Sequence, residues 1–519
     1  MVSGLSREIL MRVIRFIRLY TVCALLLPLA ASAAVQLPNL FSDHAVLQRD
    51  RPVRIWGSAT AGEQVTIRFH GQTVSTQTDP MGNWEAWLTP EPAGGPYTLA
   101  VSGNSTPTPI ERTDILVGDV WLASGQSNME FPLTGFTGTS PAPLKDGEKE
   151  IAAANHPRLR LLMQKRATST VPLTEASDGW TECTPDTARH FSAIAYFFGR
   201  EISERENVPV GLIDSTWGGT PAHSWISTEG LADANLTSVF EDAGRIAQDQ
   251  GRADQIRAYY AREDAALQAA GKPPATHPRI PTDHGGAWVP GTLFNAMIAP
   301  YTRYTIKGAI WYQGETDSDV KRAPYYFRVF STLISDWRRQ WGEGDFPFLF
   351  VQISSFNSPA PGWPVVRDAQ RRTLALRHTG MAVTLDVGTP DNVHPPDKQT
   401  VAHRLALAAR AGVYGEAIEY SSPEFLQATT EPNAVRVWFT HADGLTAHDQ
   451  EVGGFEVAGD DHVFVPATAK IEKIGESNTV LVSSPKVVFP RFVCYDWSGV
   501  VTTFLYNRAG LPAGSFTSE

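Results

Sequence analysis

Between residues 115 and 411, short apolar runs alternate with longer amphipathic segments, and this alternation limits the possible folds more than any other feature of the chain. The apolar runs predict strands at Ile115–Ala123, Val210–Asp214, Gly308–Tyr312, Phe348–Ile353 and Met381–Asp386. The amphipathic segments predict helices at Phe191–Arg205, Tyr325–Trp341, Arg367–Arg377 and Lys398–Ala411. Strands that alternate with helices form βαβ units, so we expect an α/β domain whose parallel sheet is covered on both faces.

The sequence on either side of this region consists of shorter apolar segments without the alternating helices. With 519 residues the chain is long enough for two or three domains. Short segments separated by Gly, Pro and Asp turns predict an N-terminal β-sandwich over residues 34–113, followed by the α/β domain over 114–420 and a second β domain over 421–519. The predicted strands of the two flanks are Val53–Trp56, Gln64–Phe69, Trp84–Leu88, Tyr97–Val101, Ala434–Phe439, Gly454–Val457, Lys470–Ile474, Val480–Ser483 and Val500–Leu505.

One polar stretch interrupts the α/β region. Residues 231–285 contain a helix-forming segment, Ala243–Ala270, that lacks a strong apolar stripe. We expect a helical insertion that packs on the surface of the domain.

The first 33 residues have the pattern of a secretory signal. Arg12, Arg15 and Arg18 precede the apolar run Val22–Ala30, and the small residues Ala31-Ser32-Ala33 follow it. A basic flank, a short apolar core and a small-residue exit predict cleavage after Ala33 and a secreted or periplasmic protein. A membrane anchor is the alternative, but the run is short for a bilayer and no second candidate follows.

Charge and cysteine content exclude several classes of function. The net charge is −11, which argues against a nucleic-acid partner because phosphate binding requires basic patches. Cleavage of the signal would leave Cys183 and Cys494, and neither lies in a short Cys or His spacing typical of a metal site. We expect two separate buried thiols, no metal and no cofactor.

Polar residues follow four of the predicted strands. Ser127 comes after the first strand, Ser215–Thr220 after the second, Gln313-Gly314-Glu315 after the third, and Asp391–His394 after the last. Because the carboxyl ends of parallel strands share one edge of the sheet, these side chains can converge there. Each motif alone is common in turns, but their placement at successive strand ends predicts an active site.

The residue types suit acyl transfer. A serine hydroxyl needs a base, histidine serves as one near neutral pH, and a carboxylate can orient the imidazole. Ser127 is the predicted nucleophile, His394 the base and Asp391 the acid. Asp386 is the alternative acid, and a Ser–His dyad without an acid is the other alternative. The predicted oxyanion donors are the N–H of Ser127, the N–H of Gly218 or Gly219, and the Gln313 amide.

Two further residues are candidates for substrate contact. Trp217 could stack on a sugar ring, although tryptophans at strand ends are more often packing residues. Asn295 could orient a substrate, although capping a local turn is the more common role for asparagine.

Four blocks occur in a fixed order: Gly125-Gln126-Ser127-Asn128-Met129, Trp217-Gly218-Gly219-Thr220-Pro221, Trp311-Tyr312-Gln313-Gly314-Glu315 and His394-Pro395. Together they resemble the sialate O-acetylesterase family, a branch of the SGNH hydrolases. The resemblance implies a flavodoxin-like catalytic domain that removes O-acetyl groups from sugars without a metal. It also implies Ser127 as nucleophile, His394 as base, and Gly218 or Gly219 with Gln313 at the oxyanion. The resemblance leaves open which residue, Asp391, Asp386 or none, is the acid.

We therefore expect an exported O-acetylesterase that acts on O-acetylated carbohydrates through an acyl-enzyme. Sialic acid esters are the substrate that the family name suggests, and acetylated xylan or another plant glycan is the alternative. A carbohydrate-binding protein with a vestigial site is the alternative from another class. We expect no nucleic-acid or membrane partner, and the sequence leaves the oligomeric state open.

Overall fold

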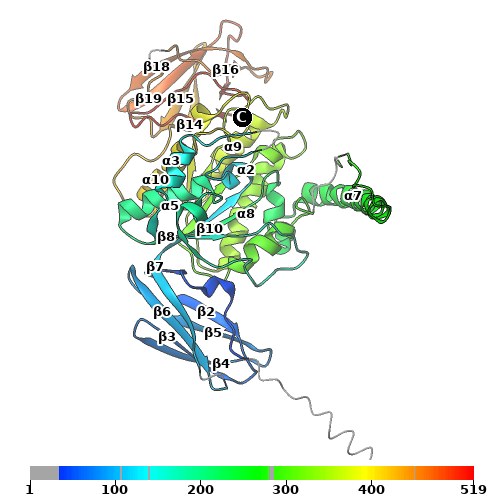
Figure 1. Ribbon diagram of the computed structural model, residues 1–519. Coiled ribbons are helices and arrows are strands. Elements are labelled where there is room, and N and C mark those ends of the chain that lie inside the picture. The colour runs from blue at the N-terminus through cyan, green and yellow to red at the C-terminus, as the bar shows by residue number, and fades with distance from the viewer. Residues whose placement is uncertain (1–33, 106–107, 138–140, 279, 281–285, 449) are drawn as a thin grey trace, which may run out of the picture.

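The computed structural model describes residues 34–519 except 106–107, 138–140, 279, 281–285 and 449, so the predicted signal segment lies outside the described residues. Figure 1 shows a central α/β region with a β region at either end, and helix α7 projecting from the centre. Of the described helices, none combines the length and the apolar character needed to cross a membrane.

The central sheet consists of parallel strands. They are β7 (Ile110–Gly125), β8 (His156–Met163), β10 (Val210–Thr216), β11 (Gly308–Tyr312), β12 (Phe348–Val351) and β13 (Thr379–Ala382). The spatial order is β13-β12-β11-β7-β10-β8, and the short β9 (Thr181–Cys183) closes one edge antiparallel. Without β8, the chain order across the sheet is 2-1-3-4-5, a doubly wound arrangement whose direction reverses beside β7. The α/β class and the parallel sheet are therefore confirmed.

Helices cover both faces of this sheet. Trp121 on β7 contacts Phe198 of α5 (Ala193–Glu206), whereas Trp311 on β11 contacts Trp337 of α8 (Tyr326–Trp341). Trp311 pairs in register with Ser124, three residues beyond Trp121, so the two tryptophans point to opposite faces. Helix α10 (Lys398–Gly412) packs on α5, and α9 (Trp363–Thr373) packs on α8.

Strand β7 belongs to two sheets. Its carboxyl half is buried throughout Val120–Gly125, as the continuous apolar run predicted. Its amino half pairs with β6 (Gly94–Gly103) and β1 (Val46–Gln48), so the predicted boundary at residues 113–114 falls inside one strand. β3 (Gln64–Phe69) and β4 (Gln72–Gln77) extend this N-terminal sheet, and β2 (Val53–Ser58) pairs with β5 (Asn83–Leu88) in a second one.

The C-terminal region forms two four-stranded antiparallel sheets, β14-β15-β19-β18 and β17-β16-β20-β21. The strands are β14 (Glu424–Glu431), β15 (Ala434–Thr440), β16 (Phe455–Ala458), β17 (Val465–Pro466), β18 (Thr468–Ile474), β19 (Ser477–Ser483), β20 (Phe492–Tyr495) and β21 (Phe516–Thr517). The predicted strand Val500–Leu505 is wrong. Its N–H groups bond to side chains instead of a neighbouring strand, Val501 to Ser355 Oγ and Leu505 to the Tyr495 hydroxyl.

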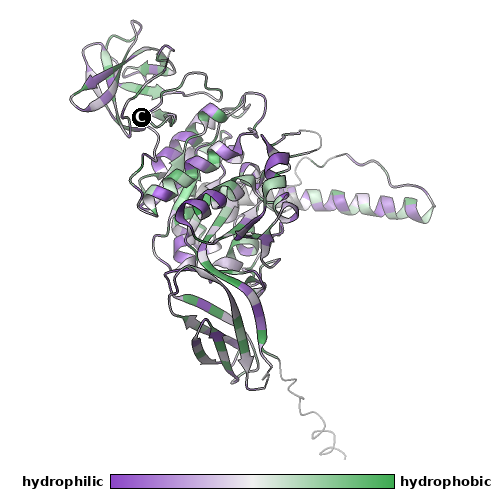
Figure 2. Ribbon diagram, turned by 60° about the vertical axis from the view of Figure 1, so that its left-hand side comes forward, coloured by the Kyte–Doolittle hydropathy of each residue, from purple (hydrophilic) through white to green (hydrophobic). Residues whose placement is uncertain are grey.

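Other predicted elements also differ from the structure in their limits or their packing. The helix predicted at Arg367–Arg377 is α9, which begins at Trp363 and ends at Thr373. The strand predicted at Met381–Asp386 ends at Ala382, because the chain then turns through the short 3-10 helix Leu385–Val387. The insertion was expected to pack on the surface, but its helix α7 (Thr237–Ala269) projects from the body (Figures 1 and 2), because a helix without an apolar stripe has no face to bury.

Candidate active site

Ser127 lies at the carboxyl end of β7, next to the point where the sheet reverses direction. Gly125 has φ +134°, and a Cβ at this position would lie 2.2 Å from the Tyr312 carbonyl oxygen, so only glycine fits. The Gln126 N–H donates to that same oxygen at 2.9 Å, and the chain then enters the single turn α2 (Ser127–Glu130). Ser127 is the first residue of that turn, so its N–H has no acceptor within the helix.

The structure brings Ser127 and His394 together. His394 Nε2 lies 2.8 Å from Ser127 Oγ, and the backbone N–H of His394 donates to Asn392 Oδ1 at 2.9 Å. The Phe136 ring packs against the imidazole in a T-shaped contact. Burial, assisted by the positive charge of Lys398, lowers the pKa of His394 to about 4. The imidazole is therefore neutral at physiological pH and can accept the proton of the serine.

Neither candidate aspartate contacts this imidazole. Asp391 is exposed, and among the described residues no hydrogen bond or ion pair joins its carboxylate to His394. Asp386 is engaged elsewhere, because both of its oxygens accept hydrogen bonds from Arg404 at 2.6 and 2.7 Å. The geometry therefore presents a Ser–His pair without an orienting aspartate.

Gly218 and Gly219, in the loop after β10, differ in whether their backbone N–H is free to bind a ligand. Gly218 packs against the nucleophile: a Cβ there would lie 3.0 Å from Ser127 Cβ. Its N–H already donates to Glu130 Oε2 at 2.8 Å, and the other Glu130 oxygen pairs with Arg166. Gly219 has φ +71° with open space beside it, and its N–H makes no hydrogen bond among the described residues. Gly219 is thus the glycine with an available donor.

Gln313 lies at the end of β11 but has no free amide proton. The side chain is fully buried, and its Nε2 donates to the Thr220 carbonyl at 3.1 Å and to Asp317 Oδ2 at 2.5 Å. Its Oε1 accepts from the Tyr326 hydroxyl at 2.9 Å. The amide therefore fastens the loop after β11 to the loop after β10, and it cannot donate to a bound oxygen without breaking one of these bonds.

The two predicted substrate contacts lie in different surroundings. Trp217 is partly buried beside Gly218, and the Arg166 guanidinium lies 5.8 Å from its ring centroid. Asn295 is buried and its Nδ2 donates to the Ser169 carbonyl at 3.2 Å. Trp217 is therefore partly exposed next to the Gly218-Gly219 loop, whereas Asn295 holds a loop.

Three residues behind the Ser–His pair were not singled out from the sequence. The buried Asn128 and Lys398 and the half-buried Glu315 form a hydrogen-bonded network that touches the neighbours of both Ser127 and His394. Asn128 and Glu315 lie inside the sequence blocks quoted above, but their side chains were not assigned a role. Lys398 follows His394 by four residues, and its burial cannot be read from a polar residue at the start of a helix.

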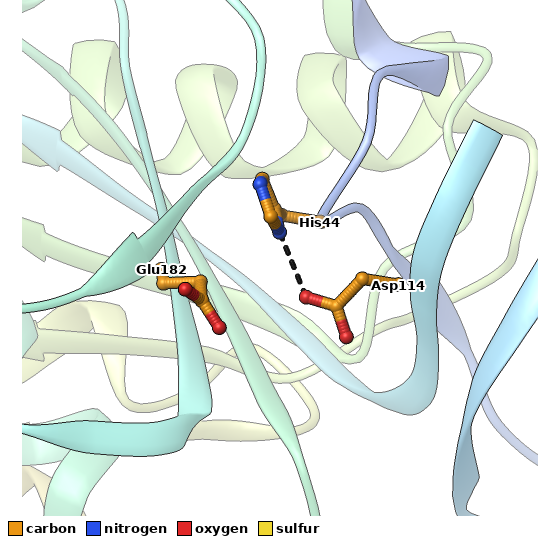
Figure 3. A group of neighbouring side chains, drawn as sticks. All are labelled: His44, Asp114 and Glu182. Carbon is orange, nitrogen blue, oxygen red and sulfur yellow. Dashed lines mark hydrogen bonds and ion pairs between the residues drawn. The ribbon is translucent and has the colours of Figure 1, made fainter.

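One group of possible metal ligands occurs among the described residues, away from Ser127. It comprises His44, Asp114 and Glu182 (Figure 3). His44 Nδ1 lies 2.7 Å from Asp114 Oδ2, and the buried Arg160 guanidinium lies at the same distance from that oxygen. Since a cation already neutralises this carboxylate, the group is an ion-pair cluster at the amino half of β7. Cys183 and Cys494 are free and buried, as expected.

The chain is similar in sequence to a family of known proteins. Residues 280–410 match the model of the carbohydrate esterase family described as sialic acid-specific acetylesterase. The chain is 31% identical to the sialate O-acetylesterase of Mus musculus over 426 residues, which cover 75% of each protein. The enzyme of Homo sapiens is also 31% identical, over 76% of this chain and 75% of that protein.

A solved structure is similar over nearly the whole chain. The crystal structure of a carbohydrate acetylesterase from Xanthomonas citri superposes with a TM-score of 0.78 at 33% identity, covering 93% of this chain and 99% of that one. The chain therefore belongs to the sialate O-acetylesterase family of carbohydrate esterases.

Proposed function

We propose that this carbohydrate O-acetylesterase is an exported serine hydrolase that works through an acetyl-enzyme. The contact of 2.8 Å between Ser127 Oγ and His394 Nε2, at the carboxyl edge of the sheet, carries the proposal. Export rests on the signal pattern of residues 1–33.

The reaction would proceed in two halves. Ser127 Oγ attacks the acetyl carbonyl carbon while its proton moves to His394 Nε2. The tetrahedral intermediate collapses, His394 returns the proton to the departing sugar hydroxyl, and the acetyl group stays on Ser127. A water molecule, deprotonated by His394, then attacks the acetyl-serine, and His394 returns the proton to Ser127 Oγ as acetate leaves.

The developing oxyanion would be held by two backbone donors, the N–H of Ser127 and the N–H of Gly219. The N–H of Gly218 is engaged by Glu130, and the Gln313 amide is engaged by Asp317 and Thr220. We therefore assign Gln313 a positioning role: it holds the Gly218-Gly219 loop against β11.

Two substrate classes remain candidates. O-acetylated sialic acids are supported by the names of the mammalian relatives. Acetylated neutral glycans such as xylan are supported by the site: the Arg166 guanidinium beside Trp217 is already paired with Glu130, and so is less available to a sugar carboxylate. Acetate release from acetylated sialic acids and from acetylated xylo-oligosaccharides would separate the two.

Comparison of the wild type with Ser127→Ala tests the mechanism. We expect the variant to lose acetate release from an aryl acetate and from the glycan panel. Ser124→Ala is the matched control, because Ser124 lies in β7 three residues before Ser127 and its Oγ is buried without a hydrogen-bond partner among the described residues. Equal background rates in the wild type and Ser127→Ala would refute the esterase mechanism and favour a carbohydrate-binding protein with a vestigial site.

A further inference from the structure

A buried amide lies between a buried lysine and a half-buried glutamate directly behind the Ser–His pair. Lys398, the first residue of α10, is completely buried, and its ammonium donates to Asn128 Oδ1. Asn128 Nδ2 donates to Glu315 Oε1 at 2.5 Å and to the Val393 carbonyl oxygen at 2.9 Å. The Lys398 ammonium and the Asn128 carboxamide are both buried, and an unmade hydrogen bond there would be costly.

The position of Asn128 in the chain gives this network its significance. Asn128 directly follows Ser127, and Val393 directly precedes His394. One carboxamide therefore ties the backbone beside the nucleophile to the backbone beside the base. These two segments are 265 residues apart in sequence, and this bond is a direct link between them.

We infer that Lys398 and Asn128 are positioning residues that hold Ser127 Oγ and His394 Nε2 at bonding distance, in place of an orienting aspartate. The inference rests on the proposed function of the pair. Neither residue needs to touch the substrate, because both act through the backbone of their neighbours.

The ammonium determines which way the amide faces. A protonated lysine can only donate, so it fixes Asn128 Oδ1 toward itself and turns Nδ2 toward the two acceptors, Glu315 and Val393. Without the ammonium, the amide could rotate and present Oδ1 to the Val393 carbonyl, which would replace an attraction with a repulsion. Lys398 thus controls the link between the two catalytic segments.

The same charge acts on the base. Lys398 contributes to the lowered pKa of His394, after burial, and burial lowers the pKa of Lys398 itself to about 7 against the opposing charges of Glu315 and Asp397. The rings of Phe131, directly after α2, and of Tyr312 on β11 also face the ammonium. Lys398 therefore also favours the neutral imidazole that the first proton transfer requires.

Lys398→Met tests the inference, since methionine fills similar volume without the charge or the donor. The rate at which a fluorophosphonate labels Ser127, followed by intact mass, reports the nucleophile without any assumption about the sugar. We expect labelling and kcat for an aryl acetate to fall about 100-fold, as for a misplacement of about 1 Å, with KM little changed. The acid limb of the labelling rate should also move to higher pH, because the neighbouring positive charge is gone.

Two other variants separate positioning from general destabilisation. Asn128→Asp keeps the acceptor for Lys398 and removes the donor to Val393, so it should lower labelling as strongly as Lys398→Met. Lys307→Met is the matched control: Lys307 also lies over an aromatic ring and near a carboxylate, but at the opposite end of β11. It should label at the wild-type rate.

The outcomes are distinguishable. If wild type is not labelled and releases no acetate, the proposed function fails. If wild type is labelled and both Lys398→Met and Asn128→Asp, each with a cooperative melting transition, stay within about twofold of it, the positioning inference is wrong. If Lys398→Met does not fold, Asn128→Asp alone decides between the same two results.

Discussion

Two lysines at opposite ends of β11 are buried to different extents and bound in different ways. At the amino end, Lys307 Nζ lies 3.7 Å from Asp119 Oδ1 and over the Tyr414 ring. Asp119 also accepts two hydrogen bonds at 3.0 Å from Arg49, so the cluster is a direct ion pair with several cations. At the carboxyl end, Lys398 meets the amide of Asn128 in place of a carboxylate.

The difference separates stability from catalysis. The amino-end cluster joins Arg49, which follows β1, to β7, so it fastens the N-terminal region to the central sheet. A direct pair suits that purpose because its only requirement is to persist. The carboxyl end must keep a neutral base beside a nucleophile. There the Asn128 amide is oriented by the Lys398 ammonium and bonds to the backbone before His394, so no carboxylate of the described residues lies against the imidazole.

The largest expected effect at the carboxyl end comes from His394→Ala. Removing the base should lower kcat about 10⁴- to 10⁶-fold, as large as the loss in Ser127→Ala, because the two groups act as one unit. The melting temperature should stay close to that of wild type. Acetate release and differential scanning calorimetry would test both expectations, and appreciable residual activity would point to another base.

Asp119→Ala is the corresponding change at the amino end. It leaves Arg49 and Lys307 without their shared carboxylate, and breaking a buried pair in this way costs about 3–5 kcal/mol of unfolding free energy. At a temperature where the variant is folded, kcat should equal that of wild type. Urea unfolding and steady-state kinetics on the same preparation would measure the two quantities; a loss of kcat larger than about tenfold would mean that the two ends of the sheet are coupled.

Much of the fold could be predicted from periodicity, and the errors have physical causes. Gly308–Tyr312 is a continuous apolar run and forms β11 with the predicted limits. β4 was not predicted because Gln72–Gln77 is polar and lies half exposed at a sheet edge, where apolar alternation is not required. The insertion was expected to pack on the surface, but periodicity says where a helix forms and not where it points.

Some residues of the candidate site could likewise be predicted from the sequence, whereas the roles of others depend on side-chain geometry. Ser127 and His394 could be predicted because each follows a buried strand at one edge of the sheet. Gln313 also lies at that edge, but only side-chain geometry reveals that Asp317 and Thr220 occupy its amide protons. The lack of contact between Asp391 and the imidazole depends on the path of one loop, and the spacing of three residues does not determine that path.

The pH dependence of the reaction sharpens the contrast between the two ends. Burial lowers the pKa of His394 to about 4, so the imidazole stays unprotonated and able to act as a base until the pH falls below that value. The acid limb of kcat/KM should therefore lie well below pH 6.5, and Lys307→Met should not move it. The limb should be recorded with a neutral aryl acetate, and an inflection near 6.5 would show that the histidine is solvated in the working enzyme.

The smallest effect is expected from Asp391→Asn. An aspartate that holds the tautomer of a catalytic histidine is worth about 10⁴-fold in kcat. Asp391 is exposed and makes no contact with His394 among the described residues, so its charge acts through solvent and should contribute about 1 kcal/mol or less, a change of about fivefold at most. Steady-state kinetics of Asp391→Asn beside Asn128→Asp would rank the two. A loss near 10⁴-fold in Asp391→Asn would mean that the 389–393 loop closes onto the imidazole during turnover, and the Asn128 amide would then share its positioning role with a carboxylate.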